Sequence, residues 1–160
     1  MKKMKHILII ILAFICFNAN AQNKACSGKE FATDEFFFRI YADGLSSDMT
    51  ASKKKAFSTA RSNIILLVNT SAETALKSHG NIEAPYLTKM IGLMQMAVRQ
   101  EGANLKAICE SSSENNGKFK SEVVVELSKE KLIKRITEII INDPTLKDKF
   151  NSDTFKSNFK

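Results

Sequence analysis

Apolar residues recur at steps of three and four along one long stretch of the chain, a spacing typical of an amphipathic helix. The pattern predicts an unbroken helix of about 45 Å from Met49 to Ser78. Its apolar positions are Ala56, Ala60, Ile64, Leu67, Val68, Ala72 and Ala75. Ser46, Ser47 and Asp48 are the candidate N-caps, and Gly80 is expected to end the helix. Because alanine dominates these positions, another layer can approach the helix closely.

A β-strand is expected just before this helix, from Phe36 to Ala42, with a turn at Asp43-Gly44. Phe36, Phe38, Ile40 and Ala42 fall on one face of the strand, and Phe37, Arg39 and Tyr41 fall on the other. A half-exposed strand normally alternates apolar with polar residues. Because the second face of this strand is aromatic, we expect another part of the protein, or another molecule, to cover it. Two interpretations stay open. We favour a further layer or a second subunit over that face, and the alternative is a surface that faces a ligand.

Two more helices are expected further along the chain. One begins at Pro85, which suits a first helical turn, and ends at Gly102. The other follows Ser128, a candidate N-cap. The apolar face of this later helix consists of Leu132, Ile133, Ile136, Ile139 and Ile140.

A β-hairpin is expected between these two helices, with strands from Leu105 to Ser113 and from Phe119 to Leu127. A two-residue turn would set Cys109 opposite Val124. A three-residue loop with Gly117 in the left-handed conformation gives a different register, and we expect this one because it places all the apolar residues on one face. Its pairs are Cys109 with Val123, Ala107 with Val125, and Leu105 with Leu127.

Near the end of the chain, the sequence predicts a short last helix that begins near Asp143-Pro144 and contains Leu146 and Phe150. The polar tail from about residue 151 is expected to be frayed. The order β-α-α-β-β-α predicts an α+β fold, in which a long helix and two further helices pack on a small antiparallel three-stranded sheet. No long linker or repeat divides the chain, so residues 22–160 are expected to form one domain.

The first 21 residues have the pattern of a signal peptide. A positive segment is followed by an apolar run of about 11 residues from Ile7 to Phe17, where a membrane-spanning helix needs roughly 20. The length therefore disfavours the alternative, an uncleaved anchor. Ala19-Asn20-Ala21 is a small-x-small cleavage site, so we expect a mature protein that starts at Gln22, with no transmembrane segment after cleavage.

Charge and cysteine content change once the signal peptide is removed. Three lysines leave with it, so the formal net charge falls from +7 to +4 by counting, and the remainder is spread along the chain. Cys16 leaves too, and the remaining Cys26 and Cys109 are expected to form a disulfide, because cysteines of exported proteins usually pair. The alternative of two reduced thiols stays open.

The sequence predicts no catalytic residue, no cofactor and no metal site. His79 is the one histidine after the signal peptide, at an expected helix end, where capping explains it better than nucleophilic chemistry. No glycine loop for phosphates and no HExxH motif occurs. Lys53-Lys54-Lys55 fan out around the long helix, so no nucleic-acid partner is expected. The hairpin glutamates are expected on one solvated face of the sheet: Glu110, Glu114, Glu122 and Glu126.

A set of residues in the first strand and the long helix carries a resemblance to a known family. They are Ala42-Asp43-Gly44, Ser46 and Asp48, then Ala56, Ala60, Arg61 and Ile64-Ile65. In this order they resemble the core of the "lipoprotein 20" family of small bacterial envelope proteins, whose domains are similar to one at the front of a flagellar assembly protein. Val123-Val124-Val125 resembles the closing strand of that family.

The resemblance covers roughly residues 36–127 and departs from the family in two respects. The lipobox is missing, so a lipid anchor does not carry over, and the second helix has no counterpart that we can match. What the resemblance implies is an envelope accessory or assembly module with no known active site. It transfers no functional residue to this chain.

We therefore expect a non-catalytic accessory module, exported to the periplasm or the outside of a Gram-negative envelope. It is expected to act through contacts with another envelope protein, and Phe37, Arg39 and Tyr41 are its candidate contact surface. The alternative is an exported binding protein that holds a small or anionic ligand between the second face of the sheet and the basic helices. An enzyme is not expected.

Overall fold

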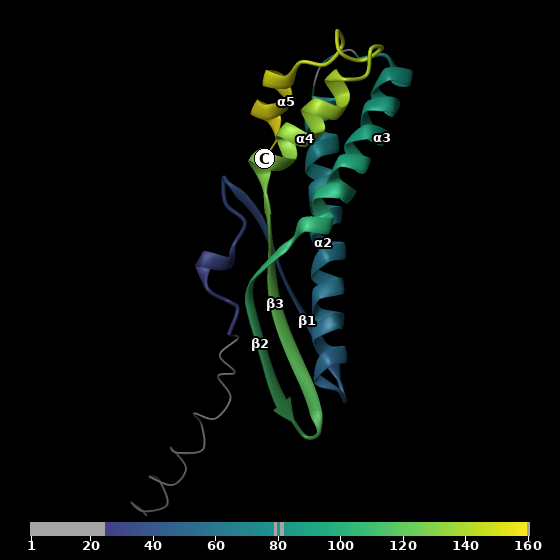
Figure 1. The fold of residues 1–160 in the computed structure, drawn as a ribbon. Coiled ribbons are helices and arrows are strands. Elements are labelled where there is room, and N and C mark those ends of the chain that lie inside the picture. The colour runs from purple at the N-terminus through teal and green to yellow at the C-terminus, as the bar shows by residue number, and fades with distance from the viewer. Residues whose placement is uncertain (1–24, 79, 81, 160) are drawn as a thin grey trace, which may run out of the picture.

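A computed structural model describes residues 25–78, 80 and 82–159 of the chain (Figure 1). Its α+β class and the order of its helices and strands confirm the predicted fold. The strands are β1 (Phe37–Ser46), β2 (Lys106–Asn115) and β3 (Lys118–Ser128). The helices are α2 (Met49–Lys77), α3 (Ala84–Glu101), α4 (Lys129–Ile141) and α5 (Ser152–Asn158), with 3-10 turns η2 (Lys29–Phe31) and η3 (Gly102–Asn104). The predicted signal peptide and Gln22 lie outside the described residues.

Helix α2 is the longest element, and β1, β3, α3 and α5 pack against it (Figure 1). The sheet, in the order β1-β3-β2, covers its N-terminal half, where α2 lies against β1 and β3. Helices α3, α4 and α5 gather around its C-terminal half (Figure 1). Among the described helices, none combines the length and the apolarity that a membrane crossing needs.

The predicted stripe of small residues on α2 forms the centre of the core. Ala56, Ala60, Ile64, Val68, Ala72 and Ala75 are all 0–1% exposed. Asp48 caps the helix, because its carboxylate accepts a hydrogen bond from the Ala51 N–H at 2.7 Å. The helix ends at Lys77, and Gly80 adopts a left-handed φ of 86° beyond it.

Strand β1 does not turn at Asp43-Gly44, as the sequence suggested, but continues to Ser46. Position 44 requires glycine because the backbone of α2 lies too close to it to leave room for a side chain. A Cβ atom at position 44 would meet the backbone oxygen of Ser52 and would lie 2.6 Å from the backbone nitrogen of Ala56. Gly44 therefore sets the distance between sheet and helix rather than a turn.

The hairpin loop prediction is wrong. Asn115 pairs with Lys118 across a two-residue turn in which Asn116 and Gly117 have φ values of 53° and 71°, the conformation that follows the twist of a hairpin. Cys109 therefore lies opposite Val124 rather than Val123. The expected pairing of Ala107 with Val125 still occurs, because a β-bulge between Ala107 and Cys109 shifts the register by one residue.

The two-residue turn also corrects the prediction that the hairpin glutamates share one face. Glu110 pairs with Val123, a buried residue on the helix side of the sheet. Glu122 pairs with Ser111 and hydrogen-bonds Tyr41 on the opposite side. Paired residues share a face, so these two carboxylates point to opposite sides of the sheet.

The last part of the chain differs from its prediction in two ways. Turns replace the expected helix after Asp143-Pro144, although Leu146 is fully buried and Phe150 nearly so. The tail expected to be frayed forms α5, where Phe155 and Phe159 are 0% and 6% exposed. Phe159 packs edge-on against Phe38 with ring centroids 5.7 Å apart. Phe155 and Phe159 are the two apolar residues among residues 151–160, which is too few to form a periodic pattern. The sequence therefore did not predict this contact.

Candidate functional site

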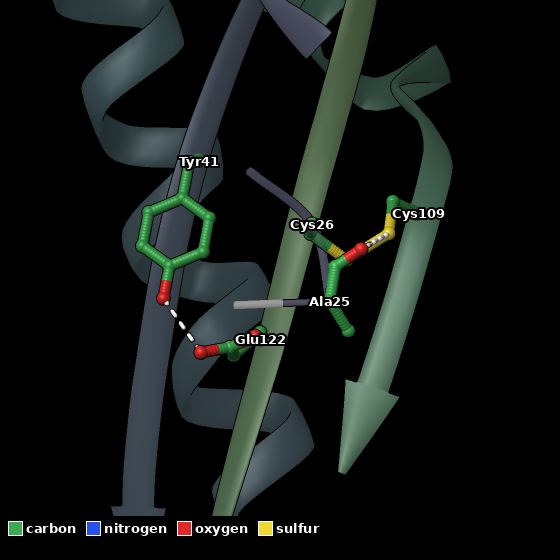
Figure 2. Close-up of a disulfide and its surroundings, with 5 residues drawn as sticks. All are labelled: Ala25, Cys26, Tyr41, Cys109 and Glu122. Carbon is green, nitrogen blue, oxygen red and sulfur yellow. Dashed lines mark hydrogen bonds between the residues drawn. A yellow bond between two sulfur atoms is a disulfide. The ribbon is translucent and has the colours of Figure 1, made fainter. Parts of the chain in front are cut away.

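Residues 25–34, called the arm below, lie against the face of the sheet that α2 leaves uncovered. The arm supplies the further layer that the sequence called for on that face. It is joined to β2 by a disulfide between Cys26 and Cys109, whose Cα atoms are 5.7 Å apart, so the structure contains the predicted bond (Figure 2). Cys26 is 1% exposed, and Val124, opposite Cys109, is fully buried. Helix α2 packs on the opposite face of the sheet, against β1 and β3.

Arg39, one of the three predicted contact residues, is engaged within the molecule. Its Nε donates to Glu126 Oε2 at 2.8 Å, and one terminal nitrogen donates to Asp34 Oδ2 at 2.6 Å and to the Ala32 carbonyl at 3.1 Å. The hydrogen bond to Glu126, followed by that to Asp34, raises the pKa of Arg39. The Arg39 side chain is 14% exposed and forms ion pairs with two carboxylates, that of Asp34 in the arm and that of Glu126 in β3. Arg39 therefore attaches the arm to the sheet.

Tyr41, the second predicted contact residue, is also engaged. Its hydroxyl donates to Glu122 Oε1 at 3.1 Å, which Figure 2 shows below the disulfide. Lys120 donates to the same oxygen at 2.9 Å, and the backbone N–H of Ala25 in the arm contributes as well. Burial alone would raise the pKa of Glu122, but the hydrogen bonds from Lys120 and Tyr41 outweigh it and leave the pKa lowered. Glu122 is thus an ionised acceptor between sheet and arm.

The arm also occupies part of the open edge of β1. The Thr33 hydroxyl accepts a hydrogen bond from the Arg39 N–H at 2.9 Å and donates to the Arg39 carbonyl at 3.1 Å. One residue further on, the Asp34 N–H donates to the Phe37 carbonyl at 3.0 Å. These bonds close the first part of a strand edge that could otherwise pair with another chain.

Phe37, the third predicted contact residue, lies where the sheet meets the helices. The guanidinium carbon of Arg39 is 5.1 Å from the centre of its ring. Phe37 borders a hollow of about 500 Å³ beside Lys129 and Ile133 of α4, and a second of about 480 Å³ beside Lys106 of β2. Of the three predicted residues, Phe37 is the one that faces open space at this junction.

Phe36 is a site residue that the strand pattern missed. It was expected on the apolar face with Phe38, but it precedes β1 and is 63% exposed, whereas Phe38 is 1% exposed. The carboxylate of Asp34 explains the difference, because its Oδ1 accepts hydrogen bonds from the N–H groups of Phe36 and Phe37, both at 2.8 Å. Both hydrogen bonds lower the pKa of Asp34, and the bond from the Phe36 N–H has the larger effect. An Asp two residues before an aromatic pair is the signal that could have shown this turn.

The part of the chain that the structure describes contains no cluster of metal ligands. Across residues 25–78, 80 and 82–159, no three His, Cys, Asp or Glu side chains gather as ligands would. His79 lies outside the described residues.

Comparison with protein-family models and with characterised proteins gives no match for this chain. The resemblance to the lipoprotein 20 family therefore stays a prediction.

Proposed function

We propose that this protein is a non-catalytic, exported accessory module of the cell envelope that holds another envelope protein, with Phe36 at the centre of its contact surface. One observation carries the proposal: a large aromatic side chain is exposed on a backbone that is fixed from both sides. The Phe36 N–H donates to Asp34, and the Phe36 carbonyl accepts from the Lys129 N–H at 2.9 Å.

A fixed aromatic residue is well suited to protein binding. Side chains that contribute most to interfaces are usually large and insert into pockets of the partner. A protein that must order a loop when it binds loses affinity, whereas Phe36 already sits on an ordered backbone. Its 63% exposed ring has no covering layer among the described residues.

The surroundings of Phe36 have the composition of an interface. The two hollows beside Phe37 could receive side chains of a partner, with Ile133 and Leu127 as apolar lining. Lys134 lines the first hollow and Lys131 lines the second. Protein contacts typically combine apolar residues with charged residues of this kind.

Export is supported by the disulfide, which is typical of proteins that mature in oxidising compartments. The signal-peptide pattern of residues 1–21 supports the same proposal. A Gram-negative envelope is the finer proposal, and it agrees with what the resemblance to the lipoprotein 20 family implies.

Crosslinking in the cells that produce the protein tests the proposal. A photoreactive phenylalanine analogue at position 36 is expected to crosslink one main protein, which Phe36→Ser should fail to co-purify. The matched control is position 66, because Leu66 is equally exposed at 68% but lies on α2 away from the junction. Both variants should keep the wild-type melting temperature. Equal crosslinking from positions 36 and 66, or full capture by Phe36→Ser, would show that Phe36 is not the contact.

A further inference from the structure

A second site lies between α2 and the edge strand β2, and it shares no residue with the Phe36 surface. Helix α2 packs over β1 and β3, so the helix side of β2 extends beyond it. Glu110 and Ser112 face this side, because they pair with the buried residues Val123 and Ser121. The cavity that results has a volume of about 410 Å³, within the usual range for ligand sites.

The wall on α2 is basic. Lys53, Phe57 and Arg61 follow one another at intervals of four along the helix, and Lys54 lies beside them. Within the described part of the chain, no ion pair engages any of these three cations. Phe57 is half-buried, and with Ala56 and Val123 it forms an apolar floor. This wall fits an anionic group next to an apolar body.

The wall on β2 accepts hydrogen bonds instead of donating them. The Ser52 hydroxyl donates to the Met49 carbonyl at 2.8 Å, so its contact with Ser121 at 2.6 Å must use the proton of Ser121. The contact between Ser121 and Ser112 at 2.9 Å must then use the proton of Ser112. Ser112 therefore presents lone pairs to the cavity, beside the carboxylate of Glu110.

We propose that this cavity binds a short peptide with free ends. The carboxylate of the peptide faces Lys53 and Arg61, its amino group faces Glu110 and Ser112, and an apolar side chain lies on Phe57. A fatty acid or another simple anion fits less well. Its apolar body would remove the Glu110 carboxylate from water without supplying a donor, which is costly.

Titration followed by amide NMR tests the site in the oxidised mature protein. The probes are tripeptides of alanine with leucine, valine or phenylalanine at the centre. At least one is expected to shift the signals of residues 56–61 and 110–112 saturably. N-acetylation and C-amidation of that peptide should each weaken binding by about tenfold, because each removes one charge-assisted hydrogen bond. Decanoate should bind more weakly than the free peptide.

Variants then tie the binding to the two walls. Arg61→Ser and Glu110→Gln are expected to weaken binding by about tenfold each. Lys77→Ser is the matched control, because Lys77 lies on the same helix but pairs with Glu73 at 2.7 Å, far from the cavity lining. The proposal fails if no tripeptide shifts the cavity residues up to about 10 mM. It also fails if the capped peptides or decanoate bind as well as the free one. Neither result would bear on partner capture through Phe36, so the two proposals stand or fall separately.

Discussion

The two faces of the sheet are covered in different ways. On the helix side, Phe38, Ala42, Val123, Val125 and Leu127 are at most 5% exposed against the alanine stripe of α2. On the arm side, Val124 and Cys26 are the hydrophobic residues buried to a similar degree among those described, and charged hydrogen bonds surround them. The helix side is therefore held by apolar burial, whereas the arm side depends on a covalent bond and on polar pairs.

The difference shows how a short segment without an apolar core of its own can still cover a sheet. A ten-residue arm buries too little surface to offset the entropy of ordering it. The disulfide removes part of that cost, and the pairs of Arg39 with Asp34 and Glu126 fix the direction in which the arm runs. The fixed turn at Asp34 then presents Phe36.

Loss of the disulfide is expected to have the largest effect on stability. Because Cys26 and Cys109 are 83 positions apart in the sequence, the double variant Cys26→Ser, Cys109→Ser should lower the free energy of unfolding by about 4 kcal/mol. Urea denaturation measures this, and reduction of the wild type should give a similar loss. Helix content should be kept, because α2 packs on the other face. A loss below about 1 kcal/mol would mean that the arm is held without the bond.

Gly44→Ala probes the helix side and should have the next largest effect. The added Cβ would meet the backbone of Ser52 and Ala56, which cannot move aside as a side chain could, so we expect a loss of about 3 kcal/mol. Gly92→Ala is the matched control, because nothing lies within 4 Å of its Cβ position on α3. That variant should gain about 1 kcal/mol. Equal effects of the two substitutions would contradict the close packing of β1 on α2.

Acid should weaken the arm side by a smaller amount. The lowered pKa of Asp34 means that its contribution is complete above its ordinary pKa of 3.8 and fades as the pH falls through the folded value. Asp34→Asn should therefore flatten the fall of the melting temperature below about pH 4.

Asp143→Asn, a variant outside the sheet, is compared with Asp34→Asn in the same acid titration. Hydrogen bonds from Lys89 and then Thr145 lower the pKa of Asp143 from 3.8 to about 2, so this variant should flatten the acid-induced loss further. Melting curves of wild type and both variants from about pH 6 to pH 2 decide the matter. Unchanged slopes would show that neither carboxylate is stabilised in the fold.

The sequence was sufficient for the features that follow from periodicity and local chemistry. The stripe on α2, the caps at Asp48 and Ser128 and the partner cysteines all appear in the pattern of residues. The bulge beside Cys109 could not be found in this way, because a constant register was assumed and a bulge changes it in mid-strand.

The candidate contact surface was harder to predict than the fold. Alternation placed Arg39 and Tyr41 on the correct face, but their partners come from the arm and from β3, which are distant in the sequence or precede the strand. Phe36 was placed on the same strand face as Phe38 because the strand was taken to begin one residue too early. The closing α5 was missed because its contacts with Phe38 span more than a hundred residues.

Hydrogen exchange of the oxidised and the reduced protein measures most directly whether the arm covers the second face and fixes Phe36. The amides of Phe36 and Phe37, which donate to Asp34, and of Arg39, which donates to Thr33, are expected to exchange at least about tenfold faster after reduction. The amides of α2 from Ala56 to Ile64 should keep their rates, because α2 packs on the other face. Unchanged rates at Phe36, Phe37 and Arg39, or an equal acceleration in α2, would contradict this account.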